Sequence, residues 1–534
     1  SRRDEVGTLK EMLTTREARP TGEGRVLIRG PVDRLFEQAR SWRPASDSGL
    51  ARAPTTDEAS GADQVVVDVT TDDALGADDM CGLLDRLARR EVSPDELWDA
   101  AVARAERANK DLNAVCTWVG RSSSGPADGP FAGVPTAIKD NEDLAGYPTS
   151  WGSRAVPDQP ARASSPFVEQ FLRLGLAPIA KTTLPEFGFT ASAESSRFGA
   201  TGNPWDTRRS AGGSSGGSAA LVGAGVVPLA HGNDGGGSIR IPAAACGLVG
   251  LKTSRGRIVD RPEEARMPVS YKSQGVLTRT VRDTARYVAE AEREYANPDL
   301  PPVGLVTGPS PRRLRIGVTD TSLMGIPVAA VSRQAVIGAA QVCEGLGHHV
   351  GPVDPVIDHR FCPDLGRYFC LLAFLMQHAG GRMLGAEFNA DRTDPLLKGM
   401  SSMAARSVWQ LPASLRRLRR LAAAGEEVFD RCDVLLVPSA GHETPPIGYL
   451  APDLDADEHL IRLLRFMAGN PVQNISGSPA VSLPLARTAA GLPVGVELVA
   501  PPGQERQLLE LAFELEMAAP WPHRPSAARG AEER

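Results

Sequence analysis

The chain has 534 residues, of which 42% are hydrophobic and 23% are charged, and its formal net charge is -6. This balance is ordinary for a globular protein, and the negative charge excludes a general attraction to nucleic acid, so we expect a small molecule as the partner. The cysteines are scattered and form no Cys-x-x-Cys pair, which excludes a disulfide framework and a zinc site. No run of 18 apolar residues is present, which excludes a membrane span. Together with the lack of an apolar leader, these observations favour a cytoplasmic protein.

The first residues differ in character from the rest of the chain. Two short helical patterns, Glu5–Arg16 and Val32–Trp42, flank a possible strand at Val26–Ile28. Residues 44–63 are rich in Ser, Ala, Thr, Asp and Pro without helical or strand periodicity, which is typical of segments that bury too little apolar surface to order themselves. We therefore divide the sequence into an N-terminal appendage and linker (1–65), a large domain (66–520) and a C-terminal tail (521–534).

The large domain begins near Asp73 with two amphipathic helices. The second helix begins after Ser93, which caps it, with Pro94 in the first turn and Glu96 closing a capping box. Strand-like and helical segments then alternate, which predicts an α/β sheet, and residues 313–431 are predicted to be mainly helical. The expected strands are Pro135–Ile138, Leu176–Ala180, Val226–Ala230, Val434–Val437, Ala480–Leu483 and Val494–Val499, with a helix over Phe167–Leu174.

Two glycine-rich clusters that carry Ser214 and Ser238 lie 24 residues apart, and the isolated Lys139 precedes them at the end of an apolar segment. A serine hydroxyl needs a base to take its proton, and only His231 among the eight histidines lies near these clusters. Desolvation would lower the pKa of Lys139 toward neutrality, so a Ser-Lys pairing is favoured over Ser-His. Glycines before Ser238 let several backbone N–H groups face one point, as an oxyanion requires.

Three motifs occur in order: Gly133-Val-Pro-x-x-Ile-Lys-Asp-Asn141, Gly212-Gly-Ser-Ser-Gly-Gly217 and Asp234-x-Gly-Gly-Ser-Ile-Arg-Ile-Pro-Ala243. Together with Asn474-x-Ser-Gly-x-Pro-Ala480 they resemble the amidase signature family of Ser-cis-Ser-Lys hydrolases. The resemblance runs from about Asp73 to Glu516. The stretch from Phe198 to Asp234 is similar to bacterial members that hydrolyse 6-aminohexanoate cyclic dimer.

The resemblance implies an α/β fold with a large mixed β-sheet flanked by helices on both faces. It makes Lys139 the base, Ser214 the bridging serine after a cis peptide bond, and Ser238 the nucleophile that is acylated. The remaining implied site residues are the oxyanion-hole N–H groups of Gly235, Gly236, Gly237 and Ser238, the supporting residues Ser215, Asp234 and Arg240, and the substrate contacts Phe374, Met376, Gln377 and Asn474.

One departure from the family pattern lies in the oxyanion loop. The usual Thr-Asp-Ile-Gly-Gly-Ser is Asn233-Asp-Gly-Gly-Gly-Ser238 here. No catalytic group is lost. The extra glycine at position 235 is expected to loosen the loop, because glycine loses more backbone entropy when it is held in one conformation.

The expected function is hydrolysis of the C–N bond of a small carboxamide through an acyl-enzyme. We expect neither a metal nor an organic cofactor. The sequence is compatible with a homodimer. Two alternatives remain: the glutamine-hydrolysing component of an amidotransferase, which releases ammonia from glutamine within a complex, and a non-catalytic scaffold with the same fold. Ser215 also satisfies the G-x-S-x-G pattern of α/β-hydrolases, but the residues before it do not form the strand that this pattern requires.

Overall fold

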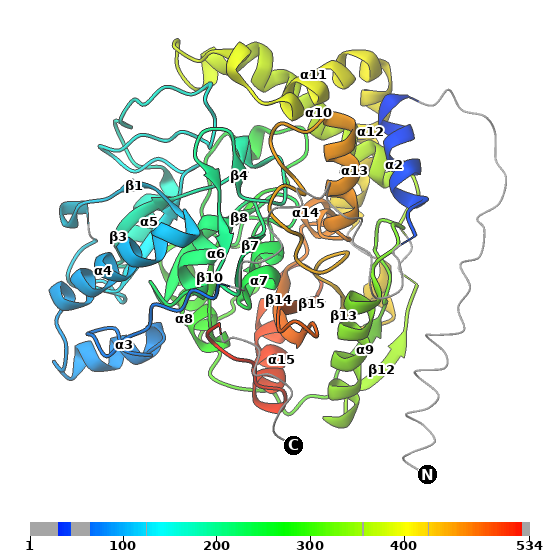
Figure 1. The fold of residues 1–534 in the computed structure, drawn as a ribbon. Coiled ribbons are helices and arrows are strands. Elements are labelled where there is room, and N and C mark those ends of the chain that lie inside the picture. Colours follow the sequence, from blue (N-terminus) through cyan, green and yellow to red (C-terminus); the bar gives the residue numbers. More distant parts are fainter. Residues whose placement is uncertain (1–29, 44–64, 124, 355–356, 425–426, 526–534) are drawn as a thin grey trace.

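A computed structural model describes residues 30–43, 65–123, 125–354, 357–424 and 427–525 of the chain. They form a layered α/β structure with a group of helices at one end (Figure 1). The helix expected at Glu5–Arg16, the strand expected at Val26–Ile28 and the linker at 44–63 lie outside the described residues.

The strands of the largest sheet are β8 (Leu229–Asp234), β9 (Val249–Lys252), β10 (Ser273–Thr278), β11 (Arg315–Val318), β12 (His349–Pro352), β13 (Val434–Pro438), β14 (Ala480–Arg487) and β15 (Pro493–Val499). Within the described residues they follow the order β12, β11, β13, β15, β14, β9, β10, β8. β11 pairs in parallel with β12 and β13, whereas the other neighbours pair antiparallel. The sheet is therefore mixed, as predicted.

A smaller sheet extends this layer beside β8. It contains β1 (Val115–Trp118), β2 (Pro135–Lys139) and β3 (Ala177–Thr182) in the order β1, β3, β2. β2 packs beside β8, where Thr136 Oγ1 donates a hydrogen bond of 3.1 Å to the Leu229 carbonyl. This packing brings the end of β2, which carries Lys139, close to the end of β8. Two short ribbons pair β4 (Glu194–Ser195) with β5 (Gly199–Ala200) and β6 (Gly202–Asn203) with β7 (Asp206–Ser210).

Helices cover both faces of the large sheet. The helices of this layer and its flanks are α3 (Met80–Ala88), α4 (Pro94–Leu112), α5 (Pro166–Arg173), α6 (Gly216–Gly223), α7 (Arg240–Cys246), α8 (Val281–Glu294), α9 (Ala330–Gly345) and α15 (Glu505–Ala518). α6 and α7 pack on one face, and α8, α9 and α15 pack on the other. β13 shows the two-sided burial: Val434 and Leu436 join the apolar core under α9 and α15, whereas Leu435 and Val437 join the opposite core. The predicted fold class is thus confirmed.

Most of the remaining helices gather at the top of Figure 1. The remaining helices are α2 (Pro31–Arg40), α10 (Phe361–Met383), α11 (Pro395–Ser407), α12 (Leu411–Ala424), α13 (Ala456–Phe466) and α14 (Pro471–Ser476). α2 is the helix expected at Val32–Trp42, and it packs against α10, α11 and α13. α2 precedes the boundary that we expected near residue 65, yet it packs onto helices of the large domain. Short 3-10 turns occupy Arg121–Ser123, Glu186–Gly188, Glu264–Arg266, Ala390–Arg392, Val408–Gln410 and Glu427–Asp430.

The local signal at Ser93 correctly predicted the start of α4. Ser93 Oγ accepts from the Glu96 N–H at 3.2 Å, and Glu96 Oε2 accepts from the Ser93 N–H at 2.8 Å, so the capping box is confirmed. The strand expected at Val226–Ala230 is wrong in its bounds, because β8 begins at Leu229 and runs on to Asp234. The region expected to be mainly helical also contains β11 and β12. Among the described helices, none has the length and apolar character needed to cross a membrane.

Candidate active site

Lys139 ends strand β2 and is fully buried. All five residues of β2 are buried, so the strand carries the ammonium-bearing side chain into the interior. Lys139 Nζ lies 2.8 Å from Ser214 Oγ and donates a hydrogen bond of 2.8 Å to Asn233 Oδ1. The isolated lysine and the first serine of the sequence patterns are therefore in direct contact.

The protonation of Lys139 follows from this environment. Burial lowers the pKa of Lys139 from its ordinary value to about 7, and the positive charge of Lys272 acts in the same direction. The carboxylates of Asp234 and Glu142 oppose the shift. A substantial fraction of Lys139 is thus a neutral amine near neutral pH, and a neutral amine has the lone pair that a proton acceptor needs.

Ser214 lies in the loop between β7 and α6, and the peptide bond between Gly213 and Ser214 is cis. Gly213 is tightly enclosed, because a Cβ atom at this position would lie 2.6 Å from the Ser192 nitrogen. Ser215 links this loop to the other serine cluster: its N–H donates to the Ser238 carbonyl at 3.3 Å, and its hydroxyl donates to the Asn233 carbonyl at 3.3 Å. The two serine-bearing loops are thereby held together.

Ser238 follows the triple glycine and lines the same cavity as Ser214. Its side chain is partly exposed to that cavity, and within the described residues its hydroxyl is bonded to no protein group. Hydrogen bonds between catalytic groups are often long or absent before substrate binds. The structure thus brings Ser214 and Ser238 to one cavity, and Lys139 is buried behind Ser214, which it contacts at 2.8 Å.

Asp234 shapes the glycine loop. Its Oδ1 accepts from the Gly237 N–H at 2.8 Å, and its Oδ2 accepts from the Ile239 N–H at 3.2 Å. The Gly237 N–H, one of the four expected oxyanion donors, is therefore engaged inside the loop. The N–H groups of Gly235, Gly236 and Ser238 are bonded to no acceptor in the described part of the chain, and these three groups can face an oxyanion.

Arg240 holds Asp234 in turn. Arg240 Nε and Nη2 donate to the Asp234 carboxylate, both at 2.9 Å, and Nη1 donates to Glu497 Oε1 at 2.7 Å. Burial alone would raise the pKa of Asp234, but the charge and hydrogen bonds of Arg240 hold it well below its ordinary value. The carboxylate therefore stays ionised and keeps its bonds to the loop, which agrees with the supporting role expected for both residues.

Two asparagines that the sequence did not single out hold Lys139. Asn141 Nδ2 donates to Asn233 Oδ1 at 3.2 Å, and Asn233 Nδ2 donates back to Asn141 Oδ1 at 3.1 Å. This reciprocal pair fixes the oxygen that accepts from Lys139 Nζ. Asn141 lies two residues after Lys139, and Asn233 directly precedes Asp234. Their positions in the motifs could therefore have identified them as site residues.

Both ring nitrogens of His231 are engaged by other groups. Burial lowers its pKa to about 4, so the ring is neutral. Its Nδ1 accepts from the Lys139 backbone N–H at 3.2 Å, and Nε2, which must carry the proton, lies 3.0 Å from Gln274 Oε1. The ring also packs on Phe167 at a centroid distance of 4.4 Å. His231 thus supports the strand of Lys139.

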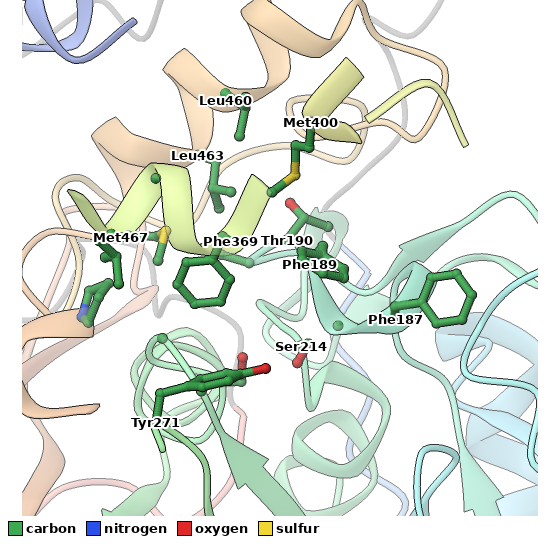
Figure 2. A pocket seen from close by; sticks show the side chains of 18 of the residues that line it. Phe187, Phe189, Thr190, Ser214, Tyr271, Phe369, Met400, Leu460, Leu463 and Met467 are labelled. Atoms are coloured by element: carbon green, nitrogen blue, oxygen red, sulfur yellow. The ribbon is translucent and has the colours of Figure 1, made fainter. Parts of the chain in front are cut away.

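The cavity above the serines measures about 190 Å³, far more than the roughly 10–15 Å³ that one water molecule needs. Its floor is polar and carries Ser214, Ser238 and Asn233, whereas most of the other lining groups are apolar. In Figure 2 the Tyr271 ring lies below the cavity with its hydroxyl directed to the side of Ser214, and Phe369, Leu463 and Met400 lie above. Such a cavity fits a small, largely apolar substrate.

The structure does not bring the expected substrate contacts to this cavity. Phe374, Met376 and Gln377 lie on a later part of α10, and the Gln377 amide is bonded to Ala390 O at 2.9 Å and to Thr393 Oγ1 at 3.0 Å. The residues of α10 that line the cavity are Leu365, Gly366, Phe369 and Cys370. An apolar run shows that a helix has a buried face, but it does not show which turn of the helix reaches the cavity.

Asn474 is also displaced from its expected role. It is buried, and its Nδ2 donates to the Asp234 carbonyl at 2.8 Å and to the Tyr271 carbonyl at 2.9 Å, while its Oδ1 accepts from Arg240. Asn474 therefore braces the oxyanion loop from behind and does not line the cavity. Among the described residues, no group of three or more His, Cys, Asp or Glu side chains is arranged to hold a metal ion.

The sequence model of the amidase family matches residues 90–509. The chain belongs to the amidase family. A putative amidase of Mycobacterium leprae is 46% identical over 455 residues, which cover 84% of this chain and 97% of that protein. The 6-aminohexanoate-cyclic-dimer hydrolase of Paenarthrobacter ureafaciens is 33% identical over 460 residues, or 81% of this chain and 92% of that protein. The solved structure of a 6-aminohexanoate cyclic dimer hydrolase gives a TM-score of 0.76 at 30% identity and covers 85% of this chain and 99% of that one.

These likenesses confirm the resemblance and identify the protein as an amide-hydrolysing enzyme. The departure at position 235 has a structural counterpart in this amidase. A Cβ atom on Gly235 would lie 2.8 Å from Cε2 of the Tyr271 ring. The glycine therefore allows an aromatic ring to lie directly against the oxyanion loop, and Tyr271 forms part of the cavity that the sequence did not reveal.

Proposed function

We propose that this amidase cleaves the C–N bond of a small carboxamide with Ser238 as nucleophile, Ser214 as proton relay and Lys139 as base. The observation that carries the proposal is the 2.8 Å separation of Lys139 Nζ and Ser214 Oγ. The pKa of Lys139 near 7 supports it, because a partly neutral amine can accept the Ser214 proton and a permanently charged ammonium group cannot.

In the first half of the reaction Ser238 Oγ attacks the amide carbonyl carbon and forms a C–O bond. Its proton passes to Ser214 Oγ while the Ser214 proton passes to Lys139 Nζ. The negative oxygen of the tetrahedral intermediate accepts from the N–H groups of Gly235, Gly236 and Ser238. Losing one such donor typically costs about 3–4 kcal/mol of transition-state stabilisation.

The intermediate then collapses with cleavage of the C–N bond. The proton held by Lys139 returns through Ser214 to the departing nitrogen, because an unprotonated amide anion is too basic to leave. This leaves an ester on Ser238 and a free amine. Water attacks the ester carbon and gives one proton to the same relay, which returns it to Ser238 as the carboxylic acid is released.

The cavity also bears on the choice of substrate. Apolar side chains surround most of it, and the charged side chains that line it, Lys272 and Glu264, are already paired with each other at 2.9 Å. The α-ammonium and α-carboxylate groups of a glutamine would have to compete with that pair. This favours a small amide with apolar substituents over the glutamine that an amidotransferase hydrolyses.

The seven cysteines are free thiols, and we propose that the enzyme works in the reducing cytoplasm.

The decisive experiment combines turnover with chemical labelling. A fluorophosphonate reacts only with an activated serine, and mass spectrometry identifies the labelled residue. We expect the label on Ser238, and we expect Ser238→Ala to lose the label and to lower kcat about 10⁴-fold or more while the protein stays folded. Ser402→Ala changes an exposed serine on α11 and serves as the control. Retained turnover in Ser238→Ala would exclude it as the nucleophile.

A further inference from the structure

Helix α2 lies outside the residues that the family model matches, yet three of its side chains line the cavity of the proposed active site. These are Val32, Leu35 and Phe36, whose exposed fractions are 2%, 5% and 4%. They form one face of a helix whose opposite face, with Arg34 and Gln38, is exposed. An element preceding the family domain thus supplies part of the wall around a substrate.

α10 is adapted to receive this helix. A Cβ atom on Gly366 would lie 2.8 Å from Val32 Cγ1 and 3.0 Å from Phe36 Cε2, so only a glycine allows α2 to approach this closely. The next residue, Arg367, donates from Nη2 to both carboxylate oxygens of Asp33 at 2.6 Å. The glycine and the arginine together fix how far α2 stands from the cavity and how it is turned.

The other end of α2 is held as well. Arg40 Nη2 donates to the His359 carbonyl at 3.2 Å, and the Trp42 ring lies under the Arg465 guanidinium at 5.6 Å. A side chain on α2 therefore has a defined position relative to the cavity, as a specificity-determining residue requires.

The three side chains belong to an apolar cluster, although Lys272 and Glu264 line the cavity elsewhere. Across the cavity from the polar floor, α10, α11 and α13 contribute Leu365, Met400, Met403, Leu460, Leu463 and Leu464. An alkyl or aryl group that enters this region leaves water and meets apolar carbon on several sides, which gains binding free energy in proportion to the area buried. A polar group there would lose its hydrogen bonds to water without replacement.

We infer that α2 determines specificity: the substrates carry an alkyl or aryl group of several carbon atoms that packs against Val32, Leu35 and Phe36. The inference rests on the proposed function for one point, that the carboxamide lies at Ser238 when the apolar group reaches α2. It adds to that function the class of substrate and the residues that select it.

The test uses two fluorophosphonates that differ in a single alkyl group, ethyl or octyl, on the full-length protein. In each case Ser238 Oγ attacks phosphorus, a P–O bond forms, fluoride leaves, and the serine proton passes to Ser214 and Lys139. We expect the wild-type protein to react at least tenfold faster with the octyl compound. Leu35→Asn replaces leucine with a polar side chain of similar size and should lower the octyl-to-ethyl rate ratio about tenfold.

Two further variants guard against misfolding. Val32→Thr is a milder change of the same kind and should lower the octyl-to-ethyl rate ratio about threefold. Gln38→Ala, on the exposed face of α2, should leave the ratio unchanged. Thermal unfolding shows whether each variant is folded. A wild-type protein that reacts equally with both compounds would overturn the inference. So would a folded Leu35→Asn protein that loses both rates in equal proportion, because α2 would then be only structural.

Failure of the proposed function gives a different result. If neither fluorophosphonate labels Ser238, the nucleophile assignment fails. The contact between α2 and the apolar group of the substrate is then tested by binding alone. Octanamide should bind Ser238→Ala protein about tenfold more tightly than it binds the Ser238→Ala, Leu35→Asn double variant, as measured by calorimetry. Equal affinity for the two proteins would overturn the inference about α2, whatever the chemistry of the serines.

Discussion

Lys139 and Asn233 are joined by a hydrogen bond of 2.8 Å between Nζ and Oδ1, and Asn233 is neutral. Ser214 Oγ lies at the same distance of 2.8 Å, so both of these partners of the lysine are neutral and can hold its side chain in place without strongly favouring the charged form. Asp234, the next residue, directs its carboxylate to Arg240 and the glycine loop. Neutral groups therefore hold Lys139, as its proposed role as a base requires.

The first prediction concerns the pH dependence of the reaction. Because the base acts in its neutral form and its pKa is lowered to about 7, kcat/KM should rise with pH through the region around 7 and level off above it. Below the pKa the rate should fall about tenfold per pH unit. A pH profile measured with one amide substrate from pH 5 to 9 checks this, and a rate that falls over that range would rule out Lys139 as the base.

Asn233→Asp tests whether the neutral amide beside Lys139 controls the pKa of the lysine. A carboxylate 2.8 Å from Nζ would stabilise the ammonium form and raise the pKa of Lys139, so the acidic limb of the kcat/KM profile should move to higher pH by at least about one unit. Asn233→Thr is the neutral comparison; it should reduce the rate without moving the limb. Identical limbs in the two variants would show that Asn233 does not control the protonation of Lys139.

A third prediction links the same lysine to folding stability. The folded pKa of Lys139 is about 7 against an ordinary value of 10.5, so between these pH values the unfolded chain binds a proton that the folded protein lacks. The lysine therefore makes the free energy of unfolding rise with pH across this window. Lys139→Met should lower that slope by about 1.4 kcal/mol per pH unit, the value for one proton.

Urea titrations at several pH values between 7 and 10 measure this slope. Lys398→Met removes an exposed lysine from α11 and should leave the slope as it is in the wild type. If both variants gave the wild-type slope, Lys139 would have to titrate alike in the folded and unfolded states, which contradicts its burial.

Elements with a simple apolar pattern were predictable from the sequence. β2, β13 and β15 are buried on both faces, and apart from Thr136, Lys139 and Glu497 their residues are apolar, so their positions were found. β8 was misplaced because it carries His231, Asn233 and Asp234 in its buried interior. Polar residues inside a buried strand break the pattern, and here they are the residues that hold Lys139 and the oxyanion loop.

The motifs predicted the contact between Lys139 and Ser214, but other contacts of the site that join distant residues could not be predicted. Asn474 braces Asp234 from a position 240 residues later, and Val32 reaches a cavity whose serines lie about 200 residues away in the sequence. Motifs identify the groups that each glycine-rich loop carries, such as Ser214 in one loop and Ser238 in another. They carry no information on which helix of another part of the chain closes the cavity, because that depends on packing of the whole molecule.

A fourth prediction concerns the buried ion cluster behind the oxyanion loop. Arg240→Met would leave the carboxylates of Asp234 and Glu497 buried without their cation, and removing one partner of such a pair costs about 3–5 kcal/mol of stability. Arg173→Met breaks the exposed pair with Glu294 and should change stability little. Chemical denaturation compares the two, and equal losses would contradict the importance assigned to the buried cluster.

The last prediction concerns the contact between Gly235 and Tyr271. The Gly235 backbone lies outside the left-handed region, so alanine is tolerated there by the backbone itself. Its Cβ atom, however, would lie 2.8 Å from Cε2 and 3.1 Å from Cδ2 of the Tyr271 ring. Gly235→Ala should therefore displace either the ring or the oxyanion loop and lower kcat/KM about tenfold or more.

A double-mutant cycle separates this contact from a general effect on the loop. In a Tyr271→Ala background the ring is gone, so Gly235→Ala should cost less than about threefold, which corresponds to an interaction energy of about 0.7 kcal/mol or more between the two sites. Equal costs in both backgrounds would mean that alanine disturbs the N–H groups directly. The predicted outcome would instead assign the family departure at position 235 to the room that the tyrosine ring needs beside the nucleophile.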